Sequence, residues 1–333
     1  MNGAKIVNMQ IQSYLVACYL YIYDNSRVIE NVCSHNKAYS PIRIPRSLIF
    51  FPFLLSLSYI CYRIVTSNSP NPMNMNETFN VAPALSTFSP ISLEEMSTIR
   101  LMNRTDTKYI VSLPVLMDVL RRASQYYRVQ EVEGERNIAY HTTYLDTPDY
   151  AMYLAHQNGR VIREKIRVRT YVASGLTFLE VKNKNNKGRT DKKRIRVQGV
   201  DSLHVDGGEE FLHNHAWYEL SALDLLLENH FHRITLVNKA MTERLTIDTG
   251  VHFHHLLTGT EAKLDNLAII ELKRDGRTYS PISEILRELH VRPSGISKYC
   301  VGTVLTAGEL KYNRFKPKLR LAQKIAKRKI MDI

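Results

Sequence analysis

Alternating cations mark the part of this chain that most constrains its fold. Every second residue between positions 163 and 169 is basic, and alternate side chains of an extended strand point to the same face. One face of such a strand would carry Arg163, Lys165, Arg167 and Arg169. The pattern recurs at Lys192, Arg194 and Arg196. Neighbouring like charges repel unless an anion lies against them, so these strands predict a surface or cavity that binds a polyanion.

The positive charge of the chain is concentrated in two segments. The 333 residues carry a formal charge of +13. Residues 163–196 contain twelve Lys and Arg against three Asp and Glu, and residues 311–333 contain nine against one. These segments hold +9 and +8, which leaves −4 for the rest of the chain. Basic patches attract nucleic acid, anionic lipid or phosphorylated molecules, and charge alone does not choose among them.

The cysteine spacing and the lack of nucleotide-binding motifs exclude several classes of protein. The four cysteines, at positions 18, 33, 61 and 300, form no CxxC pair and no disulfide-like pattern. We therefore expect reduced thiols in a cytoplasmic protein. The sequence has no G-x-G-x-x-G, no Walker loop and no regular alternation of strands with helices. A dinucleotide-binding fold and a P-loop enzyme are disfavoured.

The first ninety residues differ from the rest of the chain. Residues 47–62 carry no charge, but these sixteen residues fall short of the roughly 20 needed to cross a bilayer. This segment is either a membrane span, which Ile64 and Val65 extend if Arg63 snorkels, or part of an upstream extension that is not translated. In the second case synthesis starts at Met73 or Met75. Residues 67–90, rich in Ser, Asn and Pro, are expected to form a disordered linker.

From about residue 97 the pattern is that of a folded domain. Pro114 suits the first turn of a helix that continues to residue 124. Strands are expected at 108–112, 126–132, 137–145, 161–171, 176–184, 190–198, 231–238, 243–248, 252–256 and 267–273. Helices are expected at 150–156, within 203–229 (clearest at 218–227), at 280–289 and at 298–310. Many antiparallel strands with charged faces suit a closed barrel that holds a ligand. We predict an α+β fold, an antiparallel β-barrel with flanking helices.

Three further features each have two interpretations. Ser297 precedes a helix and is either an N-cap or part of an anion site at the helix N-terminus. The run His252-Phe-His254-His255 invites a metal site, but half-exposed strand histidines are the simpler interpretation because no carboxylate or cysteine has ligand spacing beside it. Residues 316–329 can form a basic amphipathic helix, either solvated or docked on a membrane or an acidic partner.

Six short motifs, taken in order, carry a resemblance to a known family. They are R-T-D-T-K-Y (104–109), Y-L-D-T (144–147), K-I-R-V-R (165–169), L-E-V-K (179–182), E-L-K (271–273) and S-K-Y-C (297–300). Together they resemble the VTC domain, the polyphosphate polymerase domain of the vacuolar transporter chaperone complex. This family is related to the CYTH enzymes in the triphosphate tunnel superfamily. The resemblance covers about residues 97–312.

The resemblance implies a tunnel lined by basic residues with an acidic metal site. The catalytic residues would be Lys108, Arg167, Arg169, Lys182 and Lys298. Substrate contacts would come from Lys165, Arg196, Lys239, Arg244 and Ser297. Glu271 and Glu180 would bind Mn²⁺ or Mg²⁺. Lys239 departs from the family, which more often has Arg there, and losing the bidentate guanidinium would weaken substrate positioning.

The reaction implied by the resemblance is transfer of the γ-phosphoryl group of ATP to a growing polyphosphate chain. Two alternatives stay open: a triphosphate or polyphosphate hydrolase of the same tunnel fold, and a non-catalytic polyphosphate-binding module. Nucleic acid is a poor candidate partner because the strand charges are not interleaved with aromatic residues. A membrane-protein partner or an anionic membrane surface also stays open.

The chain is expected to have three parts. Residues 1–90 would be an N-terminal extension with the apolar segment 47–62, residues 91–312 the tunnel domain, and residues 313–333 a basic C-terminal helix. The expected location is the cytoplasm, with membrane association left open.

Overall fold

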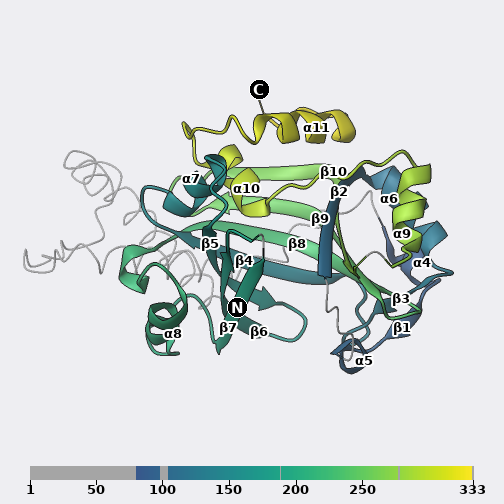
Figure 1. Cartoon of the computed structure of the whole chain (residues 1–333), viewed down its shortest axis with the longest axis horizontal. Helices are drawn as coiled ribbons and strands as arrows, with labels where there is room; N and C mark the ends of the chain where they lie inside the picture. Colours follow the sequence, from purple (N-terminus) through teal and green to yellow (C-terminus); the bar gives the residue numbers. More distant parts are fainter. Residues whose placement is uncertain (1–79, 98–103, 188, 277, 332–333) are drawn as a thin grey trace, which may run out of the picture. The chain divides into compact units, whose positions relative to one another are not determined.

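The computed structural model describes residues 80–97, 104–187, 189–276 and 278–331, which lie in one compact unit, Asn76–Ile333 (Figure 1). The apolar segment 47–62 and most of the expected linker lie outside the described residues. Helix α4 (Ala82–Leu85) and strand β1 (Ser89–Ile91) lie at the end of that linker, where Leu85 and Phe88 are buried in the core. Within the described ranges, no helix is both long and apolar enough to span a membrane.

A ten-stranded sheet forms the centre of this unit. Its main path runs through β2 (Arg104–Ser112), β10 (Glu261–Asp275), β9 (Glu243–His255), β8 (Asp224–Asn238), β4 (Ile138–Asp146), β5 (Arg163–Tyr171), β6 (Leu176–Lys184) and β7 (Thr190–Val197). Each neighbouring pair on this path is antiparallel. Strand β3 (Tyr127–Gln130) pairs with β8, and β1 pairs in parallel with β3.

The sheet does not close into the expected barrel. The two ends of its path are β2 and β7, and these strands are not paired within the described residues. Both end strands carry lysines, Lys108 on β2 and Lys192 and Lys193 on β7, and lysines on an edge strand hinder further pairing. The α+β class with an antiparallel sheet is confirmed, and the closed barrel is wrong.

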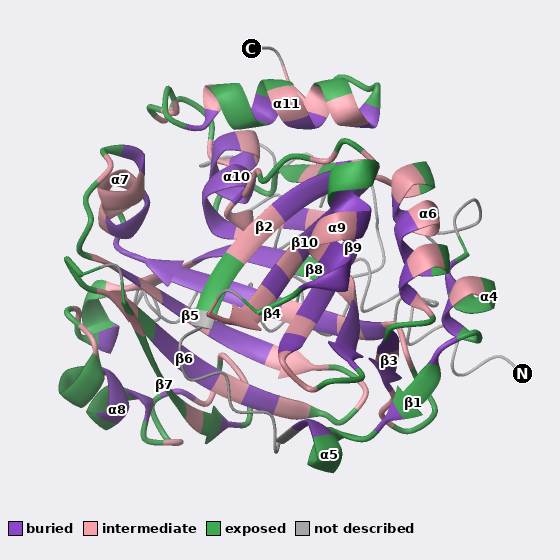
Figure 2. Ribbon diagram, turned by 45° about the vertical axis from the view of Figure 1, so that its right-hand side comes forward, coloured by how far each residue is buried: buried purple, intermediate pink, exposed green. Residues whose placement is uncertain are grey.

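Two helices cover the outer face of the sheet near β2, β10 and β9. In α6 (Leu113–Ala123) the residues Leu116, Val119 and Leu120 are fully buried. Their spacing of three and four residues places them on one side of the helix, and they share a core with Ile247 and Ile270. Helix α9 (Pro281–Glu288) packs beside α6 on this core. Figure 2 shows the buried sides of the helices facing the sheet.

The C-terminal region packs on the same unit through α10 (Lys298–Thr306) and α11 (Lys316–Ala326), next to α7 (Ala151–Gln157). In α11 the apolar residues Leu319, Ala322 and Ala326 are buried. The apolar side of this basic helix is therefore occupied by the domain itself, and its cations remain on the outside. A third core lies between β5, β6, β7 and helix α8 (Gly208–His215). The short helix α5 (Leu93–Ser97) follows β1.

The helical stretch expected within 203–229 occurs at α8 (Gly208–His215), and its expected clearest part at 218–227 is wrong. A short 3₁₀ turn, η2 (Leu220–Ala222), occurs there, and β8 begins at Asp224. Leu226 and Leu227 are both buried although they point to opposite faces of the strand. A strand buried on both faces has a continuous apolar sequence, which fits a helix equally well. The expected strands at 243–248 and 252–256 are one strand, β9, with Gly250 at φ +59° between them.

A candidate anion site on the basic face

The strand register places charged side chains from seven strands on one face of the sheet, which we call the basic face. Each member lies opposite, or two residues along from, another member. Its charged residues are Asp106, Lys108, Glu271, Lys273, Arg244, Asp248, Arg233, Lys165, Arg167, Arg169, Glu180, Lys182, Lys192, Arg194 and Arg196. Cations outnumber carboxylates, as the alternating pattern predicts.

The two ends of the basic face lie near each other in space. Lys182 is on β6, far along the sheet from β2 and β10, yet the charges of Lys108 and Glu271 act on its ammonium. The pKa of Lys182 is lowered to about 8. Loss of water is the main cause, the cations Arg167, Lys165 and Lys108 act in the same direction, and Glu271 opposes them. The sheet therefore curls so that cations from distant strands surround one region.

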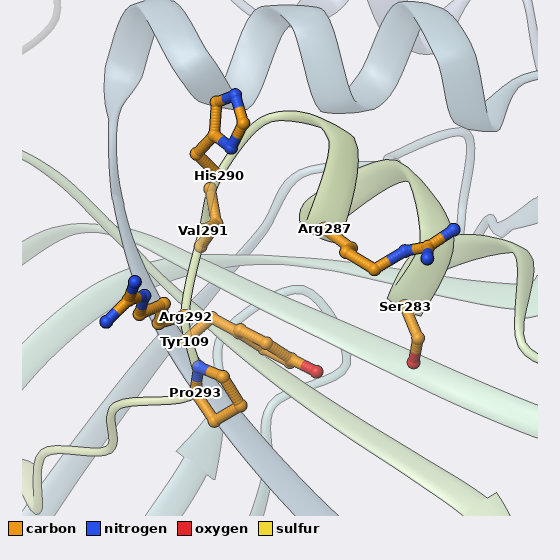
Figure 3. Close-up of a pocket in the computed structure, with 7 residues that line it drawn as sticks. All are labelled: Tyr109, Ser283, Arg287, His290, Val291, Arg292 and Pro293. Atoms are coloured by element: carbon orange, nitrogen blue, oxygen red, sulfur yellow. The ribbon is translucent and has the colours of Figure 1, made fainter.

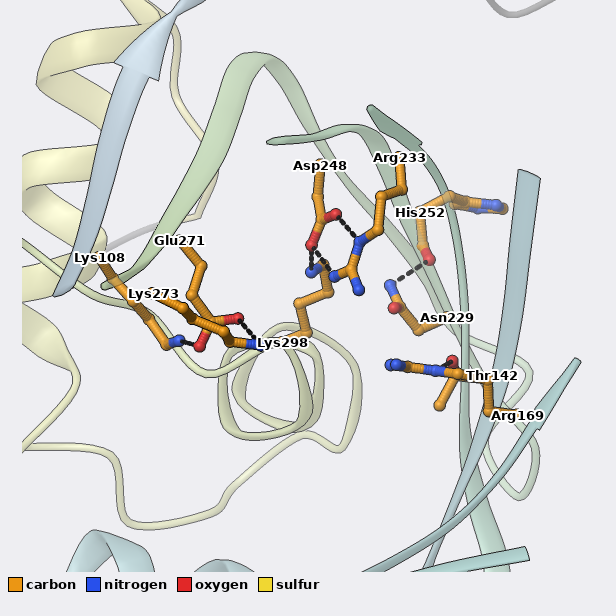
Figure 4. A network of polar contacts seen from close by, with 10 residues as sticks. All are labelled: Lys108, Thr142, Arg169, Asn229, Arg233, Asp248, His252, Glu271, Lys273 and Lys298. Carbon is orange, nitrogen blue, oxygen red and sulfur yellow. Dashed lines mark hydrogen bonds and ion pairs between the residues drawn. The ribbon is translucent and has the colours of Figure 1, made fainter. Parts of the chain in front are cut away.

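The first carboxylate of this region is Glu271 on β10 (Figure 4). It pairs with Lys108, which lies opposite it on β2, and its second oxygen lies 3.6 Å from Nζ of Lys273. Burial alone would raise the pKa of Glu271, but Lys273 and Lys108 hold it well below the usual range. Glu271 is thus an ionised carboxylate with 20% of its side chain exposed.

The second carboxylate is Asp248 on β9. Arg233 of β8 donates two hydrogen bonds to it, at 2.6 and 2.7 Å, and Lys298 of α10 pairs with the same group (Figure 4). Burial lowers the pKa of Lys298 to about 8, although Asp248 acts in the opposite direction. The Lys298 ammonium also lies 4.3 Å from the ring centre of Phe231, a cation–π contact.

The third carboxylate is Glu180 on β6, which is 1% exposed. Arg167 donates to its Oε2 at 2.7 Å, and Lys192 pairs with its Oε1. Burial would raise the pKa of Glu180, but Arg167, Arg169 and Lys192 together hold it at about 2. Because both oxygens have cationic partners, Glu180 orients Arg167 and Lys192.

Arg169 has fewer partners than the other buried cations. Its Nε donates to the Thr142 hydroxyl at 3.3 Å, and its guanidinium lies 5.7 Å from the Tyr140 ring centre. Burial, together with the charges of Arg167 and Arg233, lowers the pKa of Arg169 to about 10. A guanidinium that is 7% exposed and lies among other cations is suited to an anionic ligand.

The start of α10 adds polar groups next to the basic face. Ser297 is the N-cap, since its hydroxyl accepts from the Cys300 N–H at 3.3 Å. The same hydroxyl accepts from Lys165 Nζ at 2.7 Å. In the next turn the Tyr299 hydroxyl donates to Asp146, which also accepts from the N–H groups of Met152 and Tyr153 at the start of α7. The N-cap interpretation of Ser297 is confirmed, and the anion site at this helix N-terminus stays a prediction.

The predicted site residues lie on or beside the basic face, with one exception. Lys239 is exposed in the turn after β8, where its N–H donates to the Tyr126 carbonyl at 2.9 Å. Arg196 lies at the exposed end of β7, opposite Phe178. The expected substrate contact by Lys239 has no counterpart in this arrangement.

Six charged residues of the basic face are missing from the predicted site residues: Asp106, Lys192, Arg194, Arg233, Asp248 and Lys273. The signal for Asp248 and Arg233 is present in the sequence, because Arg244, Thr246 and Asp248 alternate along one strand, as do Phe231, Arg233 and Thr235. The Arg233–Asp248 pair joins two strands, and such a pairing is visible only once the register is known.

A pocket on the opposite side of β2 is separate from the basic face (Figure 3). It is lined by Tyr109, Ser283, Arg287, His290, Val291, Arg292 and Pro293. Tyr109 alternates with Lys108 along β2, so the two side chains point to opposite faces. This pocket therefore has no part in the cation arrangement.

Comparison with known proteins follows the geometry. The family model of the VTC domain matches residues 103–306, more than half of the chain. This chain belongs to the VTC domain family. The resemblance drawn from the six motifs is confirmed. The matched range of the VTC domain contains every strand from β2 to β10.

Solved structures with similar chain traces have low sequence identity to this VTC domain. A Hippeastrum protein reported to have a dominant triphosphatase activity is 14% identical, with a TM-score of 0.40 over 64% of this chain and 100% of that chain. The PH1819 protein from Pyrococcus horikoshii is also 14% identical, with a TM-score of 0.35 over 59% of this chain and 97% of that chain. A comparison with curated proteins yields no match.

Proposed function

We propose that this VTC domain is a phosphotransferase that extends inorganic polyphosphate with the γ-phosphoryl group of ATP and releases ADP. One observation carries the proposal: cations from β2, β5, β6, β8 and α10 gather around Glu271 and Asp248. A phosphate chain has closely spaced charges, each of which needs a partner once water is removed. We infer that the curled basic face forms the tunnel in which that chain lies.

The cations would divide the work by their chemistry. Arg167, Arg169 and Arg233 present planar guanidinium groups that suit bidentate contact with phosphate oxygens. Lys108, Lys182 and Lys298 supply point charges. Carboxylates already hold most of these groups in place, so they need little reorganisation when charge develops on the transferring group. Positioning and charge stabilisation are the main demands of phosphoryl transfer.

A divalent ion fits one of the two predicted carboxylates. Mg²⁺ and Mn²⁺ prefer oxygen ligands, and Mg²⁺ commonly uses one or two carboxylates together with substrate phosphates. Glu271 is ionised and partly exposed, so it fits this role. Glu180 is 1% exposed with cations on both oxygens, so we assign it to orienting Arg167. When bound, the ion would neutralise charge on the phosphoryl oxygens.

The state of the carboxylates favours synthesis over hydrolysis. Hydrolysis requires a water molecule to be activated, for which a general base with a pKa near the working pH is effective. The pKa values of Glu271, Asp248 and Glu180 are all lowered by adjacent cations, which makes them weak bases. The terminal oxygen of a polyphosphate chain is already anionic and needs no base. This difference favours a polymerase.

The deciding experiment is incubation of the purified protein with ATP and Mn²⁺, followed by electrophoresis to detect long phosphate chains. The polymerase predicts chains and ADP, and free phosphate alone would identify a hydrolase. Binding of polyphosphate with no turnover would leave a binding module. Lys182→Ala should reduce chain formation strongly, and Lys239→Ala, a cation in an exposed turn, should leave it unchanged.

The partners of the domain follow from the same charges. We propose ATP and inorganic polyphosphate as its ligands, since both present phosphate chains to the basic face. The outward cations of α11 would in addition be drawn to anionic lipid or an acidic membrane protein. Nucleic acid is not proposed. Of the aromatic rings near the basic face, Phe231 and Tyr140 are buried, and Phe178 lies 4.5 Å from the guanidinium of Arg194.

A further inference from the structure

A cluster of histidines and one carboxylate lies on the face of the sheet opposite the basic face. His141 precedes Thr142 on β4, and Glu228 and His230 flank Asn229 on β8. Thr142 and Asn229 belong to the basic face, because they pair with each other and Thr142 contacts Arg169. Alternation along each strand therefore places His141, Glu228 and His230 on the outer face.

The ligand atoms of these three residues converge. One nitrogen from each histidine and one carboxylate oxygen all lie within 4.8 Å of one another. His141 and His230 are register partners, and their rings stack at a centroid distance of 4.2 Å and an angle of 7°. The lone pair of an imidazole nitrogen lies in the plane of its ring, so the two rings turn out of this stacked arrangement when both bind one ion. All three residues lie on strands.

Two observations favour a metal ion over a simple ion pair at this point. Nε2 of His141 is buried and has no hydrogen-bond partner within the described residues, although Glu228 Oε1 lies 3.3 Å away. Bonds of about 2.0–2.1 Å in a tetrahedral site place neighbouring ligand atoms roughly 3.3 Å apart. The spacing of His141 and Glu228 therefore matches one edge of a tetrahedral coordination shell.

A neutral imidazole and an ionised carboxylate are the forms that bind metals. His230 is the exposed member, so the cluster is open to solvent on that side.

We propose that His141, Glu228 and His230 form a binding site for Zn²⁺ or a similar transition metal, with the fourth coordination position open. Two imidazoles and one carboxylate are a ligand set found in zinc sites that keep a water molecule. Nitrogen ligands disfavour Mg²⁺, which prefers oxygen. The site is distinct from the one proposed at Glu271, because it lies on the other face of the sheet. It also differs from the His252-His254-His255 run in the sequence, whose members are not part of the converging set.

The test uses the full chain, stripped with EDTA and titrated with Co²⁺ and then Zn²⁺. We expect one Co²⁺ per chain with the intense visible absorption of a tetrahedral site, and its loss when Zn²⁺ is added. His141→Ala and Glu228→Gln should each weaken Zn²⁺ binding by about tenfold or more. Calorimetry with Zn²⁺ alone gives the affinity, and circular dichroism in EDTA shows whether each variant folds.

A control variant separates this site from other sources of binding. His213→Ala removes an exposed histidine that pairs with Glu219 at 2.9 Å, away from the converging set. It should leave Zn²⁺ binding intact. Absence of stoichiometric binding in the unmodified chain would overturn the proposal. So would unchanged affinity in a folded variant that combines His141→Ala with His230→Ala.

Discussion

Arg233 and Asp248 face each other across β8 and β9 and are joined by two hydrogen bonds, at 2.6 and 2.7 Å. The same carboxylate holds Lys298 at the start of α10. Asp248 is 5% exposed, so it balances two cations with little help from water. This one anion determines where the sheet and helix α10 place their positive charges.

Asp248→Asn should lower the free energy of unfolding by about 3–5 kcal/mol, because removing one partner leaves buried charge uncompensated. Chemical denaturation of the ligand-free protein measures the change. A polyphosphate ligand would replace part of the missing negative charge. Tripolyphosphate should therefore raise the melting temperature of the variant by more than it raises that of the unmodified protein.

The matched control for this substitution is Asp118→Asn. Asp118 pairs with Arg121 on exposed α6 at 2.7 Å, and exposed pairs contribute about 0–1 kcal/mol. Equal losses of stability in the two variants would show that Asp248 has no special role in balancing charge.

The pH dependence of ligand binding and of stability should have opposite signs. Burial lowers the pKa of Lys182, Lys273 and Lys298 to about 8 in each case. Polyphosphate binding needs the charged forms, so affinity should fall as the pH rises from 7 to 9. Unfolded lysine titrates near pH 10.4. Between about pH 8 and 10 the unfolded chain therefore binds more protons, and the ligand-free protein should become more stable.

Calorimetric titration with tripolyphosphate at several pH values, beside denaturation curves, measures both trends. Lys182→Arg keeps its charge throughout this range, so the fall in affinity should be smaller in that variant. Affinity that stays constant from pH 7 to 9 would contradict the lowered lysine pKa values.

Glu271→Gln should separate binding from catalysis. The change removes the anion that pairs with Lys108 and Lys273, which leaves more net positive charge for a phosphate chain. Polyphosphate affinity should be kept or increased, whereas Mn²⁺-dependent chain synthesis should fall by about 100-fold or more. Gel assays and calorimetry give the two values. Full synthesis by this variant would exclude Glu271 as the metal ligand.

Tyr299→Phe should destabilise the protein by about 1–3 kcal/mol, because Asp146 is buried and would lose a hydrogen bond. Thermal or chemical denaturation measures this loss. Tyr279→Phe is the matched control, since Tyr279 donates to Glu284 at 2.7 Å but is 69% exposed. A loss of similar size in both variants would contradict a specific role for Asp146 in joining α7 to α10.

Local patterns predicted much of this fold because they depend on neighbours in sequence. The strands at 161–171, 176–184 and 190–198 were found within two residues at each end, since alternating charge and apolar residues define them directly. The start of β8 was not predicted, because apolar and polar residues do not alternate there. The open seam lies between β2 and β7, which are far apart in sequence, so local patterns do not predict it.

The candidate site was predicted unevenly for a similar reason. Motifs such as L-E-V-K identified Glu180 and Lys182 as alternating charges on one strand. They could not show that Glu180 has cations on both oxygens, nor that Asp248 holds Lys298, because those partners come from other elements. The His141 and Glu228 pair was invisible for the same reason, since the two residues are 87 positions apart in sequence and meet only through strand pairing.

Helix α11 lies beyond residue 306, where the family match ends, yet its buried side shares a core with Tyr299 and Val304 of α10. A fragment that ends at residue 306 would lack Phe315 and Leu319, so the core residues that these two side chains cover would be exposed to water. Its α10, which carries Lys298, would lose support from outside. Recombinant fragments that end at the family limit would then aggregate and bind phosphate chains poorly, although every motif of the family would still be present.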